Sequence, residues 1–394
     1  MGPIVRVGPR YVGTMESSGR CDDRFAGVRS AFEANFEAGT EHGAALAVTL
    51  DGELVVDLWG GDATGDDGAD RPWERDTIVN VWSTTKTMTA ICGLMLADRG
   101  ELDLDAPVAD VWPEFAAGDK ASVTTNHLLS HSAGLPGWSE PMTQADLYDW
   151  DKATALLAAQ SPWWEPGTAS GYHAITQGYL LGEVARRVSG RTVGTFFAEE
   201  VASPLGADFH IGTGEEHDPR AVHVIPPEPD APAFGNANEI SIRALSNPPM
   251  DASAANTIPW RRAEIPAAGG FGNARAVATV HAAIACGGSV DGVTLMSPEG
   301  CERIFDEQIN GQDLILPAVL RLGSGFGLVS EAIPVGPNPR TCFWGGWGGS
   351  LAVIDLDARM SVAYVMDKMS GGTMGDLRAA GPLMAAHAAV ATPV

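Results

Sequence analysis

The sequence predicts an α/β fold in which strands from both ends of the chain form one sheet domain, with a mainly helical region inserted between them. Two observations carry this prediction. β-rich runs occur at residues 45–61 and again at residues 351–366. Much of the chain between them has apolar residues at helical spacing, which indicates packed helices.

Each of the two β-rich runs predicts a pair of strands joined by a turn. Residues 45–61 hold two strand-like segments on either side of Asp51-Gly52, a pair that adopts positive φ easily and favours a tight hairpin. Near the other end, strands are expected at about 351–356 and 361–366, with a turn at 357–359 between them.

The most distinct helix is expected to begin at Ser83 and to end near Arg99, because apolar residues recur at helical spacing and Gly100 follows as a terminating glycine. Residues from about 213 to 265 are rich in Pro, Asn and Asp and lack periodicity. Such a long segment is usually functional or ordered by packing, so it could line a cleft. Further helices are expected at about 145–160, 174–188, 192–200, 274–286 and 373–391.

Composition and charge exclude several classes of function. The 394 residues include 25 Lys and Arg against 50 Asp and Glu, which gives a formal net charge of −25. Nucleic acids and anionic membranes need a positive protein surface, so neither is an expected partner. We find no secretory signal and no apolar run of the roughly 18–20 residues that a membrane helix needs. The five cysteines are odd in number and widely spaced, which favours reduced thiols in a cytoplasmic protein.

A Ser-x-x-Lys pattern, Ser83 and Lys86, opens the predicted helix. Residues three apart on a helix share a face, so the hydroxyl and the amine can touch. A serine becomes a useful nucleophile when a neighbouring base takes its proton, and a lysine whose pKa is lowered by burial can be that base. The pattern also arises by chance on solvated helices. However, Lys86 is one of only four lysines, and it follows a β-like run at 77–81 in an otherwise apolar helix.

Other catalytic patterns are missing from the sequence. No serine has glycine at both −2 and +2, so the G-x-S-x-G turn of α/β-hydrolases is not present, and neither is H-E-x-x-H nor a phosphate-binding loop. His127 and His131 are four residues apart and could share a metal. Without a third ligand nearby, we interpret both as structural and expect no metal and no organic cofactor.

A series of motifs extends over most of the chain, from about residue 80 to 370. They are WSTTKTMTA (82–90), RGELDLDAPVADVWPEF (99–115), TTNHLLSHSAGLPGW (124–138), WEPGTASGYHAITQGYLLGE (164–183), SPLGA (203–207), PAAGGFGNARAVATVHAAIACGG (266–288) and FWGGWGGS (343–350). On these motifs the chain resembles the serine β-lactamase and penicillin-binding-protein superfamily, and within it the class C-like family VIII carboxylesterases. The resemblance is specific for the fold and less so for the substrate.

This resemblance implies a β-lactamase/transpeptidase-like fold, with a mainly antiparallel sheet flanked by helices and an inserted all-helical domain. Applied to this chain, it assigns residues 1–83 and 290–394 to a discontinuous sheet domain and residues 84–289 to the mainly helical domain. The active site is then expected in the cleft between the two domains.

In this superfamily a tyrosine of a Tyr-x-Asn type element supplies the second catalytic oxygen, and Tyr172 stands at that position. The resemblance implies that Tyr172, as phenolate or through Lys86, takes the Ser83 proton and later activates water. A phenol with an ordinary pKa near 10 needs a cation beside it to do so, and Lys86 is the obvious one. Ala174 replaces the asparagine, which removes an amide that family members use on a polar substrate side chain.

The third element of the superfamily, Lys-Thr-Gly or His-x-Gly, corresponds here to Trp344-Gly345-Gly346, which is typical of the family VIII esterases. The resemblance implies that the N–H groups of Ser83 and Trp347 form the oxyanion hole. An indole carries no charge, so Trp344 argues against an anionic β-lactam and for a neutral acyl substrate. The residues expected to bind substrate are Trp344, Gly345, Gly346, Trp138 and His173, and Trp163, Trp164 and Trp347 add to an expected aromatic cleft.

Together these expectations describe a serine carboxylesterase that hydrolyses neutral, apolar, small-molecule esters by two-step acyl transfer. Ser83 forms an acyl-enzyme, the alcohol leaves and water completes the hydrolysis. The alternatives are a β-lactamase, a D-amino-acid peptidase or amidase, or an acyltransferase of the same fold. A catalytically inactive scaffold protein is also open, although Ser83, Lys86 and Tyr172 are all present. The oligomeric state is left unknown.

Overall fold

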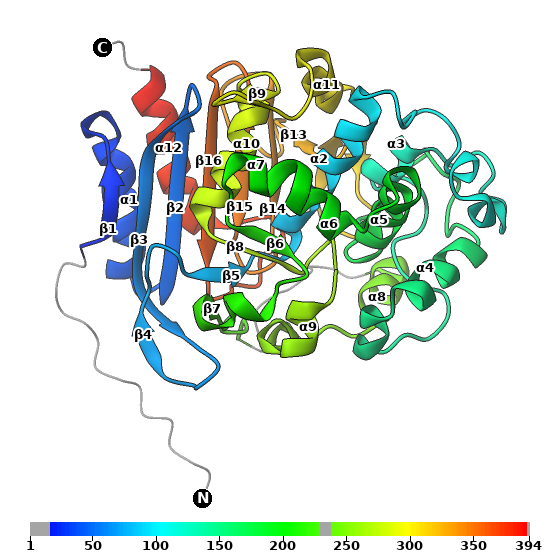
Figure 1. The fold of residues 1–394 in the computed structure, drawn as a ribbon, viewed down its shortest axis with the longest axis horizontal. Helices are drawn as coiled ribbons and strands as arrows, with labels where there is room; N and C mark the ends of the chain where they lie inside the picture. The colour runs from blue at the N-terminus through cyan, green and yellow to red at the C-terminus, as the bar shows by residue number, and fades with distance from the viewer. Residues whose placement is uncertain (1–15, 229–237, 392–394) are drawn as a thin grey trace, which may run out of the picture.

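A large antiparallel sheet runs through the computed structural model, which describes residues 16–228 and 238–391 of the chain (Figure 1). Its strands are β1 (Ser18–Cys21), β2 (Gly43–Leu50), β3 (Glu53–Thr64), β4 (Asp70–Pro72), β11 (Ile309–Gln312), β12 (Val319–Leu322), β13 (Gly327–Leu328), β14 (Thr341–Gly345), β15 (Leu351–Asp355) and β16 (Met360–Met366). In space they follow the order β1-β3-β2-β16-β15-β14-β13-β12-β11, and β4 pairs with β3 beyond this path.

Strands from opposite ends of the chain pair at the centre of this sheet. β16 lies antiparallel to β2 and pairs with it along its whole length. The hairpin predicted around Asp51 and Gly52 is confirmed, since β2 turns into β3 there and the two residues have φ of 52° and 89°. The predicted pair near the C-terminus is observed as β15 and β16. The mainly antiparallel sheet built from both ends of the chain is therefore confirmed.

Helices fill the chain between the two halves of the sheet and also flank the sheet. They are α1 (Ala26–Glu37), α2 (Thr85–Asp98), α3 (Thr125–Leu129), α4 (Trp150–Ala159), α5 (Thr176–Ser189), α6 (Val193–Phe197), α7 (Ser203–Leu205), α8 (Glu239–Leu245), α9 (Ile258–Arg262), α10 (Ala274–Ala285), α11 (Pro298–Glu302) and α12 (Leu377–Ala391). The expected helices coincide with α2, α4, α5, α6, α10 and α12, with boundaries shifted by a few residues.

Both faces of the sheet are covered. Ser361 and Tyr364 on β16 are three residues apart, so their side chains point to opposite faces. The Ser361 hydroxyl donates to the Ala278 carbonyl of α10, whereas the Tyr364 ring contacts Phe32 of α1. Because α12 packs beside α1, the first and last helices cover one face and α10 covers the other (Figure 1).

A second sheet lies among the helices, and only one of its strands, at 78–80, coincides with a run that the sequence marked as β-like, at 77–81. Within the described residues it has four strands, in the order β6 (Phe209–Ile211), β8 (Gly270–Gly272), β5 (Ile78–Asn80) and β7 (Ala221–Val222), and a separate ribbon joins β9 (Ser289–Val290) to β10 (Val293–Thr294). Strands of two or three residues are too short to leave an alternating pattern in the sequence. The region between the two halves of the large sheet is therefore mainly helical with a small sheet.

Where the two expected domains divide stays a prediction. α10 lies inside the span 84–289 assigned to the helical domain, yet it packs against β2, β15 and β16 of the large sheet. The segment 213–265, in which no regular elements were expected, contains β7, α8 and α9. Part of that segment, 229–237, lies outside the described residues.

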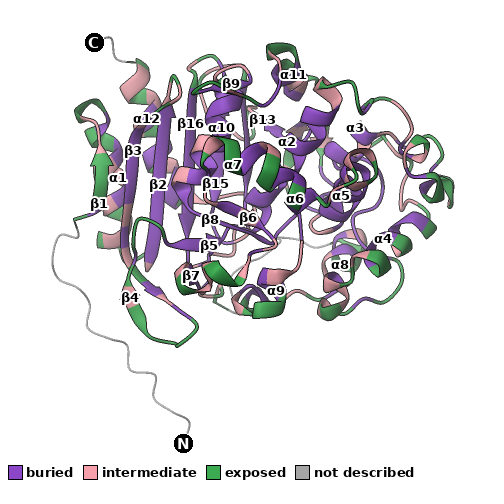
Figure 2. Ribbon diagram, viewed as in Figure 1, coloured by how far each residue is buried: buried purple, intermediate pink, exposed green. Residues whose placement is uncertain are grey.

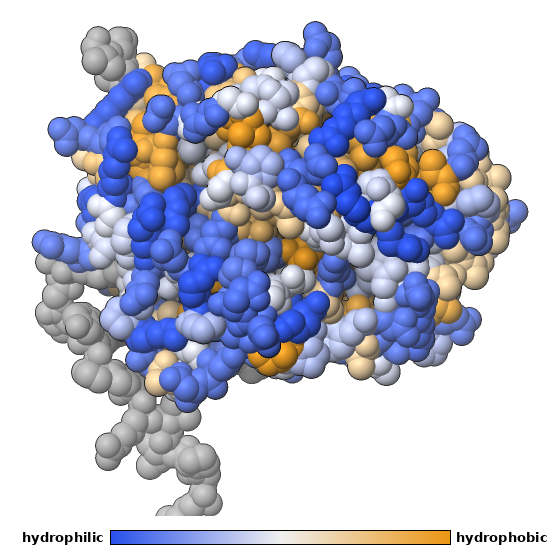
Figure 3. All heavy atoms as spheres, in the orientation of Figure 1, coloured by the Kyte–Doolittle hydropathy of each residue, from blue (hydrophilic) through white to orange (hydrophobic). Residues whose placement is uncertain are grey.

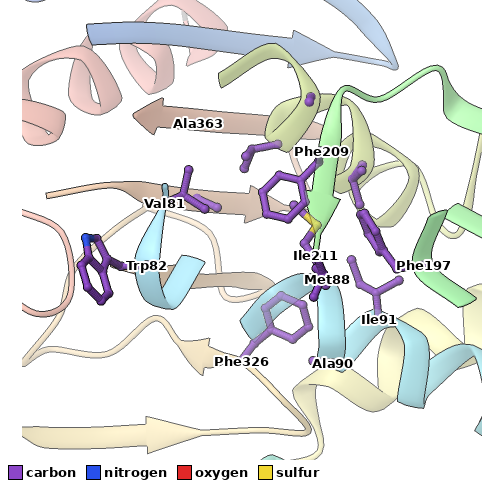
Figure 4. Packing of buried hydrophobic residues seen from close by; sticks show 14 of the residues in the cluster. Val81, Trp82, Met88, Ala90, Ile91, Phe197, Phe209, Ile211, Phe326 and Ala363 are labelled. Carbon is purple, nitrogen blue, oxygen red and sulfur yellow. The ribbon is translucent and has the colours of Figure 1, made fainter. Parts of the chain in front are cut away.

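Helix α2 is buried on all sides. Every residue from Thr85 to Leu96 is buried, as the purple ribbon of α2 in Figure 2 indicates. Figure 4 shows Met88 and Ile91 of this helix in a cluster with Phe209 and Phe326. A helix that is packed all round has little freedom to move, so the residues at its N-terminus are held in a fixed place.

The face of the molecule that Figure 3 draws is mainly hydrophilic. On the face drawn in Figure 3, hydrophobic residues form separate spots among hydrophilic ones, in keeping with the net charge of −25. No helix among residues 16–228 and 238–391 is long and apolar enough to span a membrane.

Candidate active site

Ser83 lies in a tight turn between strand β5 and helix α2. This 3-10 turn, Trp82–Thr84, leads directly into α2. Trp82 has a positive φ of 48°, which a bulky residue seldom adopts, and its N–H donates to the Asn80 side chain at 3.2 Å. The Thr85 hydroxyl donates to the Trp82 carbonyl at 2.5 Å. These contacts fix the strained turn and place the Ser83 hydroxyl at the start of a rigid helix.

Lys86 is fully buried one helical turn after Ser83. Its Nζ lies 3.0 Å from Ser83 Oγ, 2.7 Å from the Ala174 carbonyl oxygen and 3.0 Å from the Ala267 carbonyl oxygen. Burial lowers the pKa of Lys86 well below its usual value, and no carboxylate of the described residues forms an ion pair with it. A neutral amine has two N–H groups and one lone pair. Because the two carbonyls accept both N–H groups, the lone pair remains for the Ser83 hydroxyl.

Tyr172 approaches Ser83 from the loop before α5. Its Oη donates to Ser83 Oγ at 2.6 Å, and Lys86 Nζ lies 4.8 Å from the centroid of its ring. Burial raises the pKa of the Tyr172 phenol above its usual value, and the hydrogen bond with Ser83 offsets only part of that rise. Tyr172 is therefore a phenol at neutral pH, which favours Lys86 over a phenolate as the group that takes the Ser83 proton.

Trp344 lies against Tyr172 and does not line the cavity described below. It is 1% exposed and stacks on the His131 ring, with a centroid distance of 5.1 Å. The centroids of the Trp344 and Tyr172 rings are 5.9 Å apart. The indole N–H has no acceptor in hydrogen-bond geometry among the described residues, although it lies close enough to the phenol to lower the pKa of Tyr172 slightly. Trp344 therefore packs against the Tyr172 ring and does not make the expected contact with substrate.

The backbone N–H groups of Ser83 and Trp347 are available to bind a negative oxygen. Neither donates a hydrogen bond to any residue that the structure describes. The two segments meet at Gly346, where an added Cβ would lie 3.3 Å from the Ser83 nitrogen. The Gly346 N–H donates to the Ser350 carbonyl at 2.8 Å, which folds the 346–350 loop back on itself. Two backbone N–H groups without an acceptor among the described residues, on segments that meet beside Ser83, are what an oxyanion hole would need.

Replacing Gly346 by alanine is expected to lower kcat about 100-fold, the scale of losing one oxyanion-hole donor. The added Cβ would lie 2.4 Å from the Val81 carbonyl oxygen and 2.2 Å from Ser350 Oγ. Rotating a side chain cannot relieve a clash with backbone, so the 346–350 loop must shift away from Ser83. Steady-state kinetics on a neutral ester measures the effect.

The matched control is Gly27→Ala in α1. The nearest atom to a Cβ there is the Ala385 Cβ, at 3.8 Å, which is ordinary van der Waals contact. This variant should keep wild-type kinetics. A Gly346→Ala enzyme with unchanged kcat would mean that the 346–350 loop does not stabilise the transition state.

Ser350 joins the two halves of the site and was not singled out from the sequence. Its hydroxyl donates to the Val81 carbonyl at 2.7 Å and lies 2.9 Å from the Thr84 hydroxyl. It therefore holds the loop between β14 and β15 against the turn that carries Ser83. Its one signal in the sequence is its place at the end of the FWGGWGGS motif.

A cavity of about 250 Å³ opens onto Ser83 and Tyr172. Its walls are mainly apolar, and none of the lining side chains that the structure describes carries a charge. They belong to Trp82, Ser83, Pro136, Gly137, Trp138, Tyr172, Ala174, Ile175, Ala244, Leu245, Asn247, Pro248, Met250, Ala268, Trp347 and Thr373. The residues from Ala244 to Met250 belong to α8 and the loop after it, so the segment 213–265 does line the cleft as expected.

Of the five residues expected to bind substrate, only Trp138 lines this cavity; like Trp344, the residues His173, Gly345 and Gly346 do not. One ring nitrogen of His173 lies 2.6 Å from the Gly171 carbonyl oxygen, and the other accepts from the Leu135 N–H at 3.0 Å. Both nitrogens are therefore used inside the protein, which gives the His173 side chain a structural role. Gly345 allows the loop before α12 to pack closely against β14, because a Cβ at this position would lie 2.2 Å from a backbone atom of that loop.

A ring nitrogen of His127 and one of His131 each accept a hydrogen bond from a backbone N–H. The Nδ1 atom of His127 accepts from the Thr124 N–H at 3.2 Å, within the cap of helix α3. The Nδ1 atom of His131 accepts from the His173 N–H at 3.1 Å. Each of these atoms is committed to a backbone donor, which agrees with the structural role expected for both residues.

One group of metal-ligating side chains lies elsewhere in the described part of the chain. Ligand atoms of Asp208, His210 and His217 come within 4.8 Å of one another. The Arg220 guanidinium already holds both oxygens of Asp208, at 2.5 and 3.0 Å, and donates to His217 Nδ1 at 2.8 Å. A cation of the protein itself therefore neutralises this group, and we assign no metal to it.

Comparison with known proteins agrees with the resemblance found in the motifs. The family model described as Beta-lactamase matches residues 29–385. A family VIII carboxylesterase of known crystal structure has 42% sequence identity and a TM-score of 0.89, over 95% of this chain and 100% of that chain. A penicillin-binding-protein homologue from Caulobacter crescentus has 40% identity and a TM-score of 0.88, over 95% and 99% of the two chains. The esterase/beta-lactamase LipL of Mycobacterium tuberculosis is 36% identical over 89% of this chain and 83% of its own length.

These similarities extend over nearly the whole chain. The family model spans both halves of the large sheet and the helices between them. The close superposition on the carboxylesterase and on the penicillin-binding-protein homologue confirms the β-lactamase/transpeptidase-like fold. The chain belongs to the beta-lactamase family.

Proposed function

We propose that this protein is a serine carboxylesterase that hydrolyses neutral, apolar esters. One observation carries the proposal: Ser83 Oγ lies 2.6 Å from Tyr172 Oη and 3.0 Å from Lys86 Nζ at the edge of an uncharged cavity. A hydroxyl, a lone-pair base and a proton donor within hydrogen-bond distance are the groups that acyl transfer needs. Several relatives are named as esterases, and a solved structure at 42% identity is a carboxylesterase.

The first half of the reaction forms the acyl-enzyme. Ser83 Oγ attacks the ester carbonyl carbon while its proton passes to the neutral amine of Lys86. The carbonyl oxygen becomes negative and is bound by the N–H groups of Ser83 and Trp347. The bond to the alcohol oxygen then breaks, and that oxygen takes the proton of the Tyr172 phenol. Lys86, now an ammonium, returns a proton to Tyr172.

The second half of the reaction reverses these roles with water. A water molecule in the place of the alcohol gives its proton to the amine of Lys86 through Tyr172, and its oxygen attacks the acyl carbon. The bond to Ser83 Oγ breaks, and Ser83 recovers its proton from Lys86. Both halves use the same oxyanion hole, so the enzyme returns to its starting state without a cofactor.

The cavity supports a neutral, apolar substrate. Its one side-chain amide, that of Asn247, accepts from the Met142 N–H and donates to the carbonyls of Trp138 and Glu140, so it is already satisfied by backbone. Ala174 offers the cavity only a methyl group. An ionised substrate group would lose its hydration in this cavity without gaining a partner.

A panel of acyl donors tests this proposal. We expect the wild-type enzyme to hydrolyse p-nitrophenyl butyrate at a rate at least about 100-fold above that for the anionic β-lactam nitrocefin or for butyryl p-nitroanilide, because one unpaired buried charge or a poor leaving group costs a few kcal/mol. Faster nitrocefin hydrolysis would identify a β-lactamase, and faster anilide hydrolysis an amidase. Butyl ester formed in the presence of butanol would identify an acyltransferase. No turnover and no labelling by a fluorophosphonate would leave only a scaffold role.

Two further expectations remain proposals. The odd number and wide spacing of the cysteines favour reduced thiols, and therefore a cytoplasmic location. The partner of the enzyme is expected to be its small-molecule ester alone, as neither nucleic acid nor membrane suits a net charge of −25.

A further inference from the structure

The short segment that carries Tyr172 is held by the loop between β11 and β12. The Oδ1 atom of Asp313, at the start of this loop, accepts the Tyr172 N–H at 3.1 Å. The next residue along the loop, Leu314, donates its N–H to the Ser170 carbonyl at 2.9 Å. These two contacts grip the backbone on both sides of Gly171. The position of the Tyr172 Cα therefore depends on the β11–β12 loop.

Asp313 also shapes the loop from which it acts. The same Oδ1 atom accepts the N–H groups of Ile315 and Leu316, each at 2.8 Å. Ile315 and Leu316 in turn belong to the apolar cluster that contains Tyr172 and Trp344. One carboxylate oxygen thus holds both the conformation of the β11–β12 loop and the position of the Tyr172 backbone.

Within the described residues, the carboxylate of Asp313 has no counter-ion. It is 3% exposed, and no cationic side chain within residues 16–228 and 238–391 forms an ion pair with it. Its second oxygen, Oδ2, is buried and has no hydrogen-bond partner in the described part of the chain. A buried charge in this state costs free energy that an asparagine or an apolar residue would avoid. A negative charge beside Tyr172 disfavours the phenolate, and it acts together with burial in raising the pKa of the phenol.

We propose that Asp313 is a positioning residue for the esterase reaction, which sets the Tyr172 phenol against Ser83 and keeps its proton available for the leaving alcohol. This inference rests on the proposed function. It predicts that the importance of Asp313 depends on the alcohol. When the bond between the acyl carbon and an alkoxide oxygen breaks, the electron pair stays on that oxygen, which then takes the Tyr172 proton. Ethoxide is a strong base and needs this proton, whereas p-nitrophenolate leaves as a stable anion without it.

The experiment compares two esters of the same acid, ethyl butyrate and p-nitrophenyl butyrate, on the wild type and on Asp313→Ala. The measured quantity is kcat/KM, which covers all steps up to loss of the alcohol. We expect kcat/KM on ethyl butyrate to fall about 100-fold, the scale of a misplaced catalytic group. On p-nitrophenyl butyrate we expect kcat/KM to fall by no more than about tenfold. A loss of folded protein would lower both values equally. The ratio of the two esters is therefore insensitive to folding.

Four further variants complete the design. Tyr172→Phe should show the same selective loss on ethyl butyrate, and the double variant with Asp313→Ala should lose little more, because the two residues act as a unit. Asp313→Asn keeps an oxygen for the three N–H groups but removes the charge. It should retain most of the activity near neutral pH and lose it at a lower alkaline pH than wild type, since the phenol then ionises more easily. Asp306→Asn, the same change on an exposed residue after α11, is the control and should behave as wild type.

The outcomes separate this inference from the proposed function. An active wild type whose ester ratio is unchanged in Asp313→Ala, or a double variant whose losses multiply, would overturn the role of Asp313 alone. A wild type that turns over neither ester and is not labelled at Ser83 by a fluorophosphonate would overturn the esterase proposal itself, and the role of Asp313 with it.

Discussion

The Lys86→Met enzyme is expected to fold normally and to hydrolyse a neutral ester about 1,000-fold more slowly than wild type, within the range that general-base catalysis supplies. Methionine fills the space of the lysine stem but has no amine, so Ser83 loses the base 3.0 Å from its Oγ. Tyr172 cannot replace that base, because burial keeps its phenol protonated. The measurement is kcat/KM on p-nitrophenyl butyrate, with circular dichroism and urea unfolding to follow the fold.

Lys120→Met is the matched control for this prediction. Lys120 is also buried, and its Nζ donates to the carbonyls of Ala117, Ala158 and Gln160. Burial lowers the pKa of Lys120 to about 8. Three carbonyls use all three N–H groups of an ammonium, so this lysine joins the turn after Ala117 to the C-terminal end of α4 and has no nucleophile to activate. Lys120→Met should reduce the free energy of unfolding and leave turnover per folded molecule unchanged. Equal losses of turnover in the two variants would show that Lys86 acts only through stability.

The same lysine sets an expected pH dependence. Because burial lowers the pKa of Lys86, the amine is neutral in the pH range where an ordinary lysine is charged. As the pH falls through this lowered pKa, the amine becomes protonated and can no longer accept the Ser83 proton. The activity of the wild type should therefore fall on the acid side, and the residual activity of Lys86→Met should lack this fall. An identical acid limb in the variant would assign the titration to another group.

The Ser83→Ala enzyme is expected to lose turnover by a factor on the order of 10⁶, as other serine hydrolases do when the nucleophile is removed. No acyl-enzyme can form, because the atom that attacks the carbonyl carbon is missing. The turn should stay folded, since the hydrogen bonds of Thr84, Thr85 and Ser350 that hold it do not use Ser83 Oγ. Kinetics on p-nitrophenyl butyrate and labelling with a fluorophosphonate, read by mass spectrometry, both report the loss.

Ser30→Ala, on the exposed side of α1, is the control for Ser83→Ala and should react as wild type does. Labelling of Ser83→Ala at wild-type rate would place the nucleophile elsewhere. In that case the hydrogen bonds of Ser83 with Lys86 and Tyr172 would have no catalytic meaning.

The four strands β2, β3, β15 and β16 of the large sheet and the helix after Ser83 were predictable because they rest on local patterns. Asp51 and Gly52 are residue types that adopt a positive φ easily, so the turn can be predicted from them. The apolar spacing that predicts α2 likewise involves only residues that are close in the chain. Of the small sheet, only β5 lies where the sequence showed a β-like run, at 77–81. β6, β7 and β8 are two or three residues long, and each pairs only with strands that are distant in the chain.

The candidate site divides in the same way. Spacing along a helix brought Ser83 and Lys86 together, and the motifs added Tyr172 and Trp347. Trp344 and His173 were expected to face the substrate, but one packs behind the Tyr172 ring and the other is bound by backbone groups. Nothing in the local sequence distinguishes an aromatic ring that lines a cavity from one that is packed behind it.

By itself, then, the sequence determined the strands β2, β3, β15 and β16, helices such as α2 and α10, the hairpin turns and the pairing of a hydroxyl with an amine one helical turn apart. Only the tertiary structure decided the protonation of the groups in the site. The Tyr172 and Ser83 oxygens come from residues 89 apart in the chain, and the Lys86 amine meets a carbonyl 181 residues further on. Burial and hydrogen-bond partners fix whether an amine is a base and a phenol is an acid, and both are supplied by segments that meet only when the chain is folded.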